Sequence, residues 1–392
     1  MRQTLLKTKA ETEKAFLVGV DSKASDDSWS IDSSLEELSY LAKTAGAEVI
    51  GRLAQKLERP SPTHYLGRGK LEELIKMREY CPYDVVIFND ELLPRQQRNL
   101  EEALKVKVID RTALILDIFS KRAHTREGQL QVELAQHQYL LPRLAGQWSH
   151  LERLGGGIGT RGPGESQLET DRRLIRKRID RLQRQIEAVR RHRALYRQKR
   201  RRSHIPVVAL VGYTNAGKST LLNALSQADV LVENKLFSTL DPVTRRLALS
   251  DGQQFLLTDT VGFIHKLPPH IIAAFRATLE ELAEADLLLH IVDITHHDAA
   301  EQFQTVEKIL ADLNLAGKPQ ITALNKMDLA MKAPEELADV APTMPDKPPD
   351  DTMVAVSALK GWGLDKLLQK IAAFLSQNHD VGCIETASHR SR

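Results

Sequence analysis

The stretch VVALVGYTNAGKSTLLNAL, residues 207–225, decides the fold of this chain. It opens with an apolar run suited to a buried strand, passes through the loop GYTNAGKS, and continues with apolar residues at helical spacing. A strand, a glycine-rich loop and a helix in this order form a P-loop. Gly212 and Gly217 let backbone N–H groups curl around phosphates, Lys218 neutralises their charge, and the Ser219 hydroxyl can bind Mg²⁺. The sequence therefore predicts a P-loop domain of the α/β class.

A second motif, ITALNKMDL at residues 321–329, predicts that the bound base is guanine. The Asp328 carboxylate can accept both donors on the Watson–Crick edge of guanine, and Asn325 can bond the Hoogsteen side. Adenine would leave that carboxylate unpaired, a mismatch that costs roughly 10⁴-fold in sites that read hydrogen bonds. A turn in which an Asp caps a helix would explain NKMD alone. The tripeptide SAL at 357–359 follows another apolar strand, where a loop facing guanine O6 belongs, and this favours GTP.

Two further stretches complete the predicted site. QFLLTDTVGF, residues 254–263, brings Asp259 to the hydration shell of Mg²⁺ and the Gly262 N–H to the γ-phosphate. In FSTLDPVTRR, residues 237–246, Thr239 can close over Mg²⁺ and the γ-phosphate as a switch that hydrolysis releases. The predicted GTP contacts are Gly212, Tyr213, Thr214, Asn215, Ala216, Gly217, Lys218, Ser219, Phe237, Ser238, Thr239, Leu240, Asp241, Asp259, Thr260, Val261, Gly262, Asn325, Lys326, Met327, Asp328, Ser357, Ala358 and Leu359. The predicted Mg²⁺ site comprises Ser219 and Thr239, with Asp259 acting through the hydration shell.

The rest of the chain divides into segments of different pattern. Residues 1–120 alternate apolar strands with amphipathic helices, one closed by Gly46 and one entered at Pro94, which predicts a small parallel α/β domain. Over residues 121–203, apolar residues recur at spacings of four and three in two runs, which predicts an antiparallel helical hairpin whose first helix is kinked by Pro142. We expect the G domain to cover 204–378 and a flexible tail to cover 379–392, with a surface loop at 341–351.

The net charge of +3 hides one strongly basic segment. Residues 172–202 carry fifteen Lys and Arg against two acidic residues, a local charge of +13, whereas a solvated helix face usually mixes signs. We interpret this second hairpin helix as a surface that faces a polyanion. The tip before it, GGGIGTRGPG at 155–164, contains six glycines, more than a helical turn requires. Its GxGxxG pattern is not a dinucleotide site, because no buried strand precedes it and no apolar helix follows.

Composition limits the class of protein. With 392 residues, 42% hydrophobic and 27% charged, the chain predicts two or three globular domains. The apolar runs are too short to cross a bilayer, the N-terminus has no signal-peptide pattern, and the two cysteines are too few for a disulfide framework. These features predict a cytoplasmic protein without a transmembrane segment.

From about residue 60 to 375 the chain resembles the HflX family of GTPases, in the same broad group as the Obg-like proteins. The resemblance is carried by YLGRGKLEEL, VIDRTALILDIF, QVELAQHQYLLPRL, GGGIGTRGPGESQLETDRR, LVGYTNAGKSTLLNAL, FSTLDPVTRR, DTVGFI and NKMD. It implies an N-terminal α/β domain, a helical hairpin and a G domain that uses GTP and Mg²⁺. It also implies binding to the large ribosomal subunit and its rRNA, and dissociation of idle or stalled ribosomes under stress, with the hairpin tip directed toward the peptidyl-transferase region.

The resemblance and the basic helix together lead to our expectations about partners. We expect rRNA contacts at Arg161, Arg172, Arg173, Arg176 and Lys177, no DNA partner, and a monomer. A GTP-gated switch for a protein or a non-ribosomal RNA is an alternative, as is a non-enzymatic RNA-binding or chaperone protein whose G domain only senses nucleotide.

One position departs from the commoner GTPase pattern and bears on catalysis. Phe263 follows DTVG where many GTPases have a water-orienting Gln, as is usual in this family, and a phenyl ring cannot orient water. Lys218, Thr239 and Gly262 are the residues expected to assist hydrolysis, with alignment supplied by the ribosome, by a backbone group or by a monovalent cation. Asn215 matches the asparagine that binds potassium in some related GTPases.

Overall fold

The computed structural model describes residues 12–22, 29–144, 167–202, 205–226, 236–249, 252–268, 271, 281–336 and 352–388. The chain divides into two compact units. The N-terminal unit comprises Met1–Lys121 and Ala135–Ile179, and the C-terminal unit comprises Arg122–Leu134 and Asp180–Arg392. The domain limits predicted from the sequence, at 120, 203 and 378, stay a prediction.

The N-terminal unit contains a four-stranded parallel sheet in the order β2-β1-β3-β4. Its strands are β1 (Lys14–Ser22), β2 (Glu48–Leu57), β3 (Val85–Phe88) and β4 (Lys107–Asp110). The helices between and after them are α1 (Ile31–Ala45), α2 (Arg68–Tyr80), α3 (Pro94–Leu104) and α4 (Arg111–Arg122). Gly46 ends α1 with φ +98°, a left-handed conformation that glycine adopts without strain. The predicted parallel α/β domain is confirmed.

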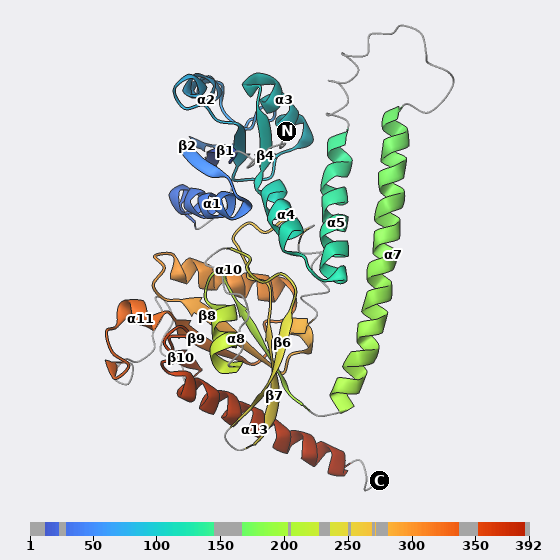
Figure 1. Cartoon of the computed structure of the whole chain (residues 1–392), viewed down its shortest axis with the longest axis vertical. Coiled ribbons are helices and arrows are strands. Elements are labelled where there is room, and N and C mark those ends of the chain that lie inside the picture. Colours follow the sequence, from blue (N-terminus) through green and yellow to red (C-terminus); the bar gives the residue numbers. More distant parts are fainter. Residues whose placement is uncertain are drawn as a thin grey trace, which may run out of the picture. The chain divides into compact units, whose positions relative to one another are not determined.

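Alternating strand residues supply the two faces of this sheet. Phe16, Val18 and Val20 of β1 belong to a core that also contains Leu74 of α2 and Leu100 of α3. Figure 1 shows α2 and α3 on one side of the strands and α1 and α4 on the other. Both faces are therefore covered by helices, as parallel sheets require.

Two further helices, α5 (Arg126–Leu140) and α7 (Gln167–Arg202), correspond to the predicted hairpin, whose glycine-rich tip lies outside the described residues. The predicted seam is buried at Leu134, Leu182 and Ile186. Instead of a kink, α5 ends at Leu140 and Pro142 lies in a short 3-10 turn, η1 (Leu141–Arg143). Because proline has no N–H and crowds the preceding turn, it ends the α-helical hydrogen bonding here.

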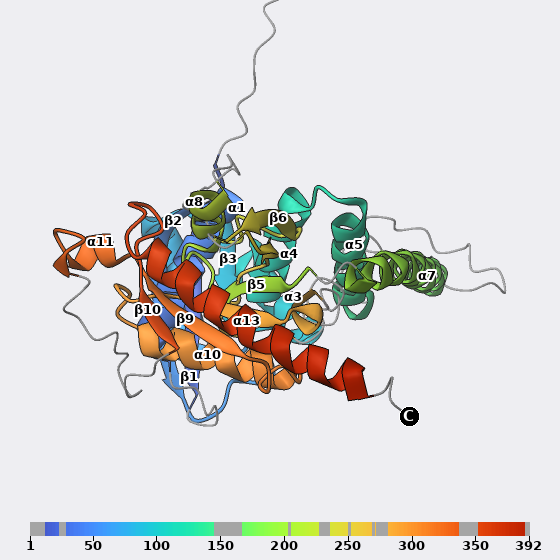
Figure 2. The ribbon, with the colours of Figure 1, turned by 90° about the horizontal axis from the view of Figure 1, so that it is seen from below.

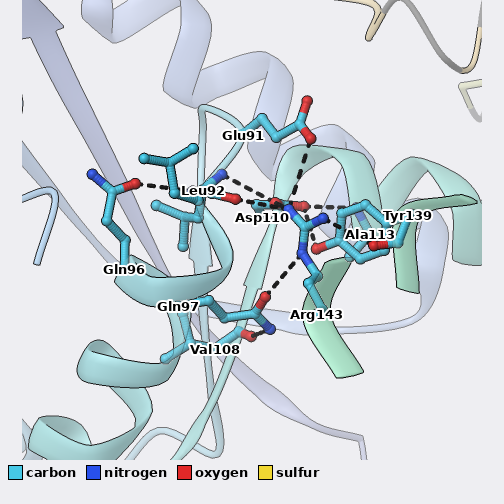
Figure 3. Close-up of polar contacts among 10 residues, drawn as sticks. Glu91, Leu92, Gln96, Gln97, Val108, Asp110, Ala113, Tyr139 and Arg143 are labelled. Atoms are coloured by element: carbon cyan, nitrogen blue, oxygen red, sulfur yellow. Dashed lines mark hydrogen bonds and ion pairs between the residues drawn. The ribbon is translucent and has the colours of Figure 1, made fainter. Parts of the chain in front are cut away.

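A buried polar network fixes the segment after α5 within the N-terminal unit (Figure 3). Arg143 donates to the carboxylate of Asp110, at the end of β4, with a nitrogen–oxygen distance of 3.1 Å, and its guanidinium lies 3.5 Å from the centre of the Tyr139 ring. Arg143 also donates to Leu92 O and to the side chain of Gln97, while the Tyr139 hydroxyl donates to Asp110. The buried charge of Arg143 is thus both paired and hydrogen-bonded, which limits the cost of its desolvation.

The C-terminal unit contains a six-stranded sheet in the order β10-β9-β8-β5-β7-β6, parallel except for β6. Its elements are β5 (Val207–Gly212), α8 (Lys218–Ser226), β6 (Val243–Ala248), β7 (Gln254–Asp259), β8 (Leu287–Asp293), α10 (Ala299–Asp312), β9 (Gln320–Asn325), α11 (Met327–Ala330), β10 (Met353–Ala355) and α13 (Leu364–Ser388). Figure 2 shows α8 and α10 on opposite sides of the strands. Leu221 of α8 and Leu367 of α13 share one core, and Phe303 of α10 packs on the other face.

The end of the chain differs from the sequence prediction. We expected a flexible tail from residue 379, but α13 continues to Ser388. The only helix-breaking residue there is Gly382, and one glycine costs about 1 kcal/mol, which does not stop a long helix. The loop predicted at 341–351 lies outside the described residues. Among the helices that the structure describes, none combines the length and apolar character that a membrane crossing needs.

Candidate nucleotide-binding site

The loop between β5 and α8 has the backbone that a P-loop requires. Gly212 and Gly217 have φ values of +148° and +100°, and Asn215 has φ +63°. A Cβ at Gly212 would overlap the carbonyl oxygen of Ile291, and a Cβ at Gly217 would overlap the side chain of Asn325. Both positions therefore need glycine for conformation and for space.

Lys218 lies at the start of α8 with its ammonium group folded back over the loop. Its Nζ donates to the carbonyl oxygens of Gly212 at 3.1 Å and Tyr213 at 2.7 Å. Burial lowers the pKa of Lys218 from 10.5 to about 8, against the opposing charge of Asp259. A bound anion beside this buried ammonium group would favour its charged form and would raise its pKa again.

Three side chains converge beside Lys218 from separate elements. Ser219 Oγ donates to Asp259 Oδ2 at 2.6 Å, and Thr239 Oγ1 donates to the same oxygen at 2.8 Å. The two hydroxyl oxygens lie 2.7 Å apart. Burial raises the pKa of the Asp259 carboxyl, while Lys218 and the two hydroxyls act in the opposite direction. The other oxygen, Oδ1, is buried and makes no hydrogen bond of ordinary geometry to the described residues.

These groups line a hollow at the carboxyl ends of β5 and β7. Its walls come from the P-loop, the segment after residue 236 and the DTVG turn. These are the three stretches that the sequence predicted to contact the phosphates and Mg²⁺. The lining residues are Thr214, Asn215, Gly217, Lys218, Ser219, Thr220, Phe237, Ser238, Thr239, Thr260 and Gly262. Thr220 was not among the predicted contacts, although its place directly after Ser219 could have indicated it.

Phe263 does not face this hollow. Its side chain is 1% exposed, and its backbone pairs with the P-loop: Phe263 N donates to Gly212 O at 3.1 Å and Thr214 N donates to Phe263 O at 2.7 Å. The residue after DTVG thus joins the core and fixes the P-loop from one side. Thr214 is held again by its hydroxyl, which accepts from Phe237 N at 2.9 Å.

Asn325 joins the P-loop to the loop that contains SAL. Its side chain is 2% exposed; Nδ2 donates to Ala216 O at 2.8 Å, and Oδ1 accepts from Ala358 N at 2.9 Å. The end of β9 therefore fixes the distance between the predicted phosphate and base sites.

Asp328 and Ser357, predicted at the guanine edge, lie together. Ser357 Oγ donates to Asp328 Oδ1 at 2.5 Å and accepts from Lys360 N at 3.1 Å. Lys326 has φ +67° and forms an ion pair of 2.6 Å with Asp293, a partner at the end of β8 that the sequence prediction missed. Asp293 is the acidic residue that ends the strand LLLHIVD, and this position could have indicated it as a partner for Lys326.

Other predicted contacts lie away from the hollow. Leu240 and Met327 are buried, whereas Leu359 is 73% exposed. The carboxylate of Asp241 accepts hydrogen bonds from the start of α5. Of the predicted RNA contacts, Arg161 lies outside the described residues; Arg172, Arg173, Arg176 and Lys177 lie on α7, the last three exposed.

Comparisons with known proteins agree with this arrangement. Three family models match in succession: GTP-binding GTPase N-terminal over residues 32–120, GTP-binding GTPase Middle Region over 122–200, and 50S ribosome-binding GTPase over 207–326. A relative named GTPase HflX from Caldanaerobacter subterraneus is 51% identical over 95% of this chain and 82% of its own. Another of that name, from Alkalihalophilus pseudofirmus, is 54% identical over 81% of this chain and 75% of its own. A solved GTP-binding protein from Sulfolobus solfataricus in complex with GDP is 25% identical, with a TM-score of 0.46, over 93% of this chain and 99% of its own.

Proposed function

Because the chain belongs to the HflX family of GTPases, and is thus a GTP hydrolase, we propose that it binds the large ribosomal subunit and dissociates idle or stalled ribosomes in a nucleotide-dependent way under stress. The observation that carries the proposal is the match of residues 207–326 to the family described as 50S ribosome-binding GTPase. A ribosomal partner also implies a cytoplasmic location, which is part of the proposal.

The same proposal assigns the hollow to the phosphates of GTP. Backbone N–H groups of the P-loop bind the phosphate oxygens, and the ammonium group of Lys218 neutralises them. Support comes from the buried position of Lys218 and from the left-handed glycines on either side of the loop. Asn325, Asp328 and the loop at 357–359 would bind guanine, since the carboxylate of Asp328 offers acceptors to the donors of that base.

We assign Mg²⁺ to Ser219 and Thr239, with Asp259 acting through the hydration shell of the cation. Hydroxyl and carboxylate oxygens are the ligands that this hard cation prefers. The buried Oδ1 of Asp259 accepts no hydrogen bond of ordinary geometry from the described residues. When bound there, the cation would supply positive charge that offsets the charge of the phosphates. The protein's own part is to hold Thr239 and Ser219 within reach of one carboxylate oxygen.

We propose that a group other than the Phe263 side chain orients the attacking water. That side chain is buried against the core and cannot reach the hollow, so the large subunit, a backbone group or a monovalent cation must supply the alignment. Asn215, exposed at the rim of the hollow, is the proposed potassium ligand.

The basic helix α7 is the proposed rRNA surface. Arg173, Arg176 and Lys177 are exposed, and their contribution to binding should be electrostatic and salt-dependent. The tip at 155–164, with Arg161, is proposed to fit against rRNA.

Cosedimentation with purified ribosomal subunits in GTP, GDP and no nucleotide tests the proposal. We expect binding to the large subunit that is strongest with GTP, and Arg173→Glu, Arg176→Glu and Lys177→Glu should weaken it and flatten its salt dependence. Charge reversal of the exposed Lys76 on α2 is a control that should change little. Absence of subunit binding in every nucleotide state would favour the alternative, a GTP-gated switch for a protein or a non-ribosomal RNA.

A further inference from the structure

The segment that carries Thr239 is held at three points within the C-terminal unit. We call residues 237–241 the switch segment. Phe237 N donates to Thr214 Oγ1, and Thr239 Oγ1 donates to Asp259 Oδ2. The third point is Asp241, whose partners His124 and Thr125 lie directly before α5 rather than in the nucleotide-binding hollow.

Asp241 is tied to the N-terminus of α5 through both carboxylate oxygens. Oδ2 accepts from His124 N at 2.9 Å and Thr125 N at 2.8 Å, and Oδ1 accepts from the Thr125 hydroxyl. That hydroxyl in turn accepts from Gly128 N at 3.0 Å, so Thr125 caps the helix. A carboxylate at this end of a helix also interacts favourably with the helix dipole.

Space as well as hydrogen bonding restricts Asp241. A Cβ added at Gly128 of α5 would overlap Asp241 Oδ1 and would lie 3.2 Å from Thr125 Oγ1. Gly128 sits inside a helix, where its φ is not positive and alanine would otherwise be favoured. The glycine therefore leaves room for the carboxylate.

We propose that Asp241 is a positioning residue for GTP hydrolysis: by anchoring the switch segment on α5, it holds Thr239 in place and couples α5 to the nucleotide site. Only Leu240, itself 3% exposed, separates the two residues, so a backbone displacement of Asp241 away from α5 also displaces the backbone of Thr239. The inference rests on the GTP hydrolase activity of the family and not on the proposed ribosomal partner.

The coupling has to act in both directions. If a closed Thr239 favours the contact between Asp241 and α5, then any ligand that displaces the start of α5 must weaken closure by the same free energy. The Arg193 side chain of α7 pairs with Glu127 at 2.9 Å, so a force on this part of α7 also reaches the first turn of α5.

A double-mutant cycle on the full-length protein tests this, using steady-state GTP hydrolysis without ribosomes. Asp241→Ala and Gly128→Ala are each expected to lower kcat about tenfold, about 1.4 kcal/mol in activation free energy, with KM for GTP and the Kd for GDP changed less than threefold. In the Asp241→Ala background, Gly128→Ala should change kcat less than twofold, because the overlapping carboxylate is gone. Asp241→Asn keeps an acceptor for the Thr125 hydroxyl and should recover part of the loss.

The matched control is Asp84→Ala, which removes a carboxylate that accepts from Lys14 N at 2.9 Å in the N-terminal unit. It should lower Tm without changing kcat. The inference is overturned if Asp241→Ala lowers Tm as this control does and keeps the parent kcat, or if the effects of Gly128→Ala and Asp241→Ala on kcat multiply. Neither result would bear on whether the protein binds ribosomes.

Discussion

Replacing Asn325 by Ala should destabilise the protein even in the absence of nucleotide. The substitution leaves the carbonyl of Ala216, 1% exposed, and the N–H of Ala358, 4% exposed, without their partner. Each buried group without a partner costs about 1–3 kcal/mol, so the two groups together should lower the free energy of unfolding by about 2–6 kcal/mol. For a unit of this size, a change of about 3 kcal/mol lowers Tm by roughly 6–12 °C.

Scanning calorimetry of nucleotide-free protein measures this effect on the transition of the C-terminal unit. Asn99→Ala is a suitable control, because it removes a surface hydrogen bond to Thr63 O in the other unit and should cost within about 0.5 kcal/mol. If Asn325→Ala matches the parent Tm without nucleotide and loses only GTP affinity, the residue does not hold the two loops together, and our reasoning from its two hydrogen bonds is wrong.

Three further predictions concern the ligand. Asp328→Asn should favour xanthosine triphosphate over GTP, because Ser357 already donates to one carboxylate oxygen of Asp328 and the new amide would present a donor to the base. If competition binding shows an unchanged preference for GTP, the placement of the base is wrong. Between pH 8 and 10.5, Lys218 binds more protons in the unfolded chain than in the folded chain. This group therefore makes the stability of the ligand-free protein rise with pH, while the affinity for GTP falls. Calorimetry in buffers of different ionisation enthalpy should detect proton uptake on GTP binding near pH 8.5. Hydrolysis should be faster in potassium than in sodium at matched ionic strength, and Asn215→Ala should abolish that difference, which an equal rate in both salts would refute.

The parts of the site that the sequence predicted are those encoded in contiguous stretches. A P-loop binds phosphate largely through backbone groups, so the strand, the glycines and Lys218 can be identified without knowing any distant contact. The same holds for the strands with apolar runs, such as β1, β3, β5 and β8, but not for β6, which begins inside the stretch interpreted as a switch. Phe263 shows the limit: its sequence position excludes a catalytic Gln, but its pairing with Gly212 and Thr214 depends on how β5 and β7 lie side by side.

Long-range pairing accounts for what the sequence could not indicate. Asp241 stands in a motif typical of nucleotide contacts, yet its hydrogen-bond partner Thr125 is 116 residues away. Arg143 and Asp110 form a buried ion pair across 33 residues, and the two stretches that contain them give no sign that they pair. Such pairs follow from the packing of whole elements, which hydrophobic periodicity alone does not specify.

The division into two units has a practical consequence for truncation. Its boundaries fall after Lys121, after Leu134 and after Ile179, inside the helices α4, α5 and α7, whereas boundaries between units ordinarily lie in exposed linkers. No single cleavage point therefore releases an intact C-terminal unit. A fragment beginning at residue 205 would keep every nucleotide motif but would lose His124 and Thr125, which bind Asp241. We expect this fragment to hydrolyse GTP as slowly as a variant without the Asp241 anchor.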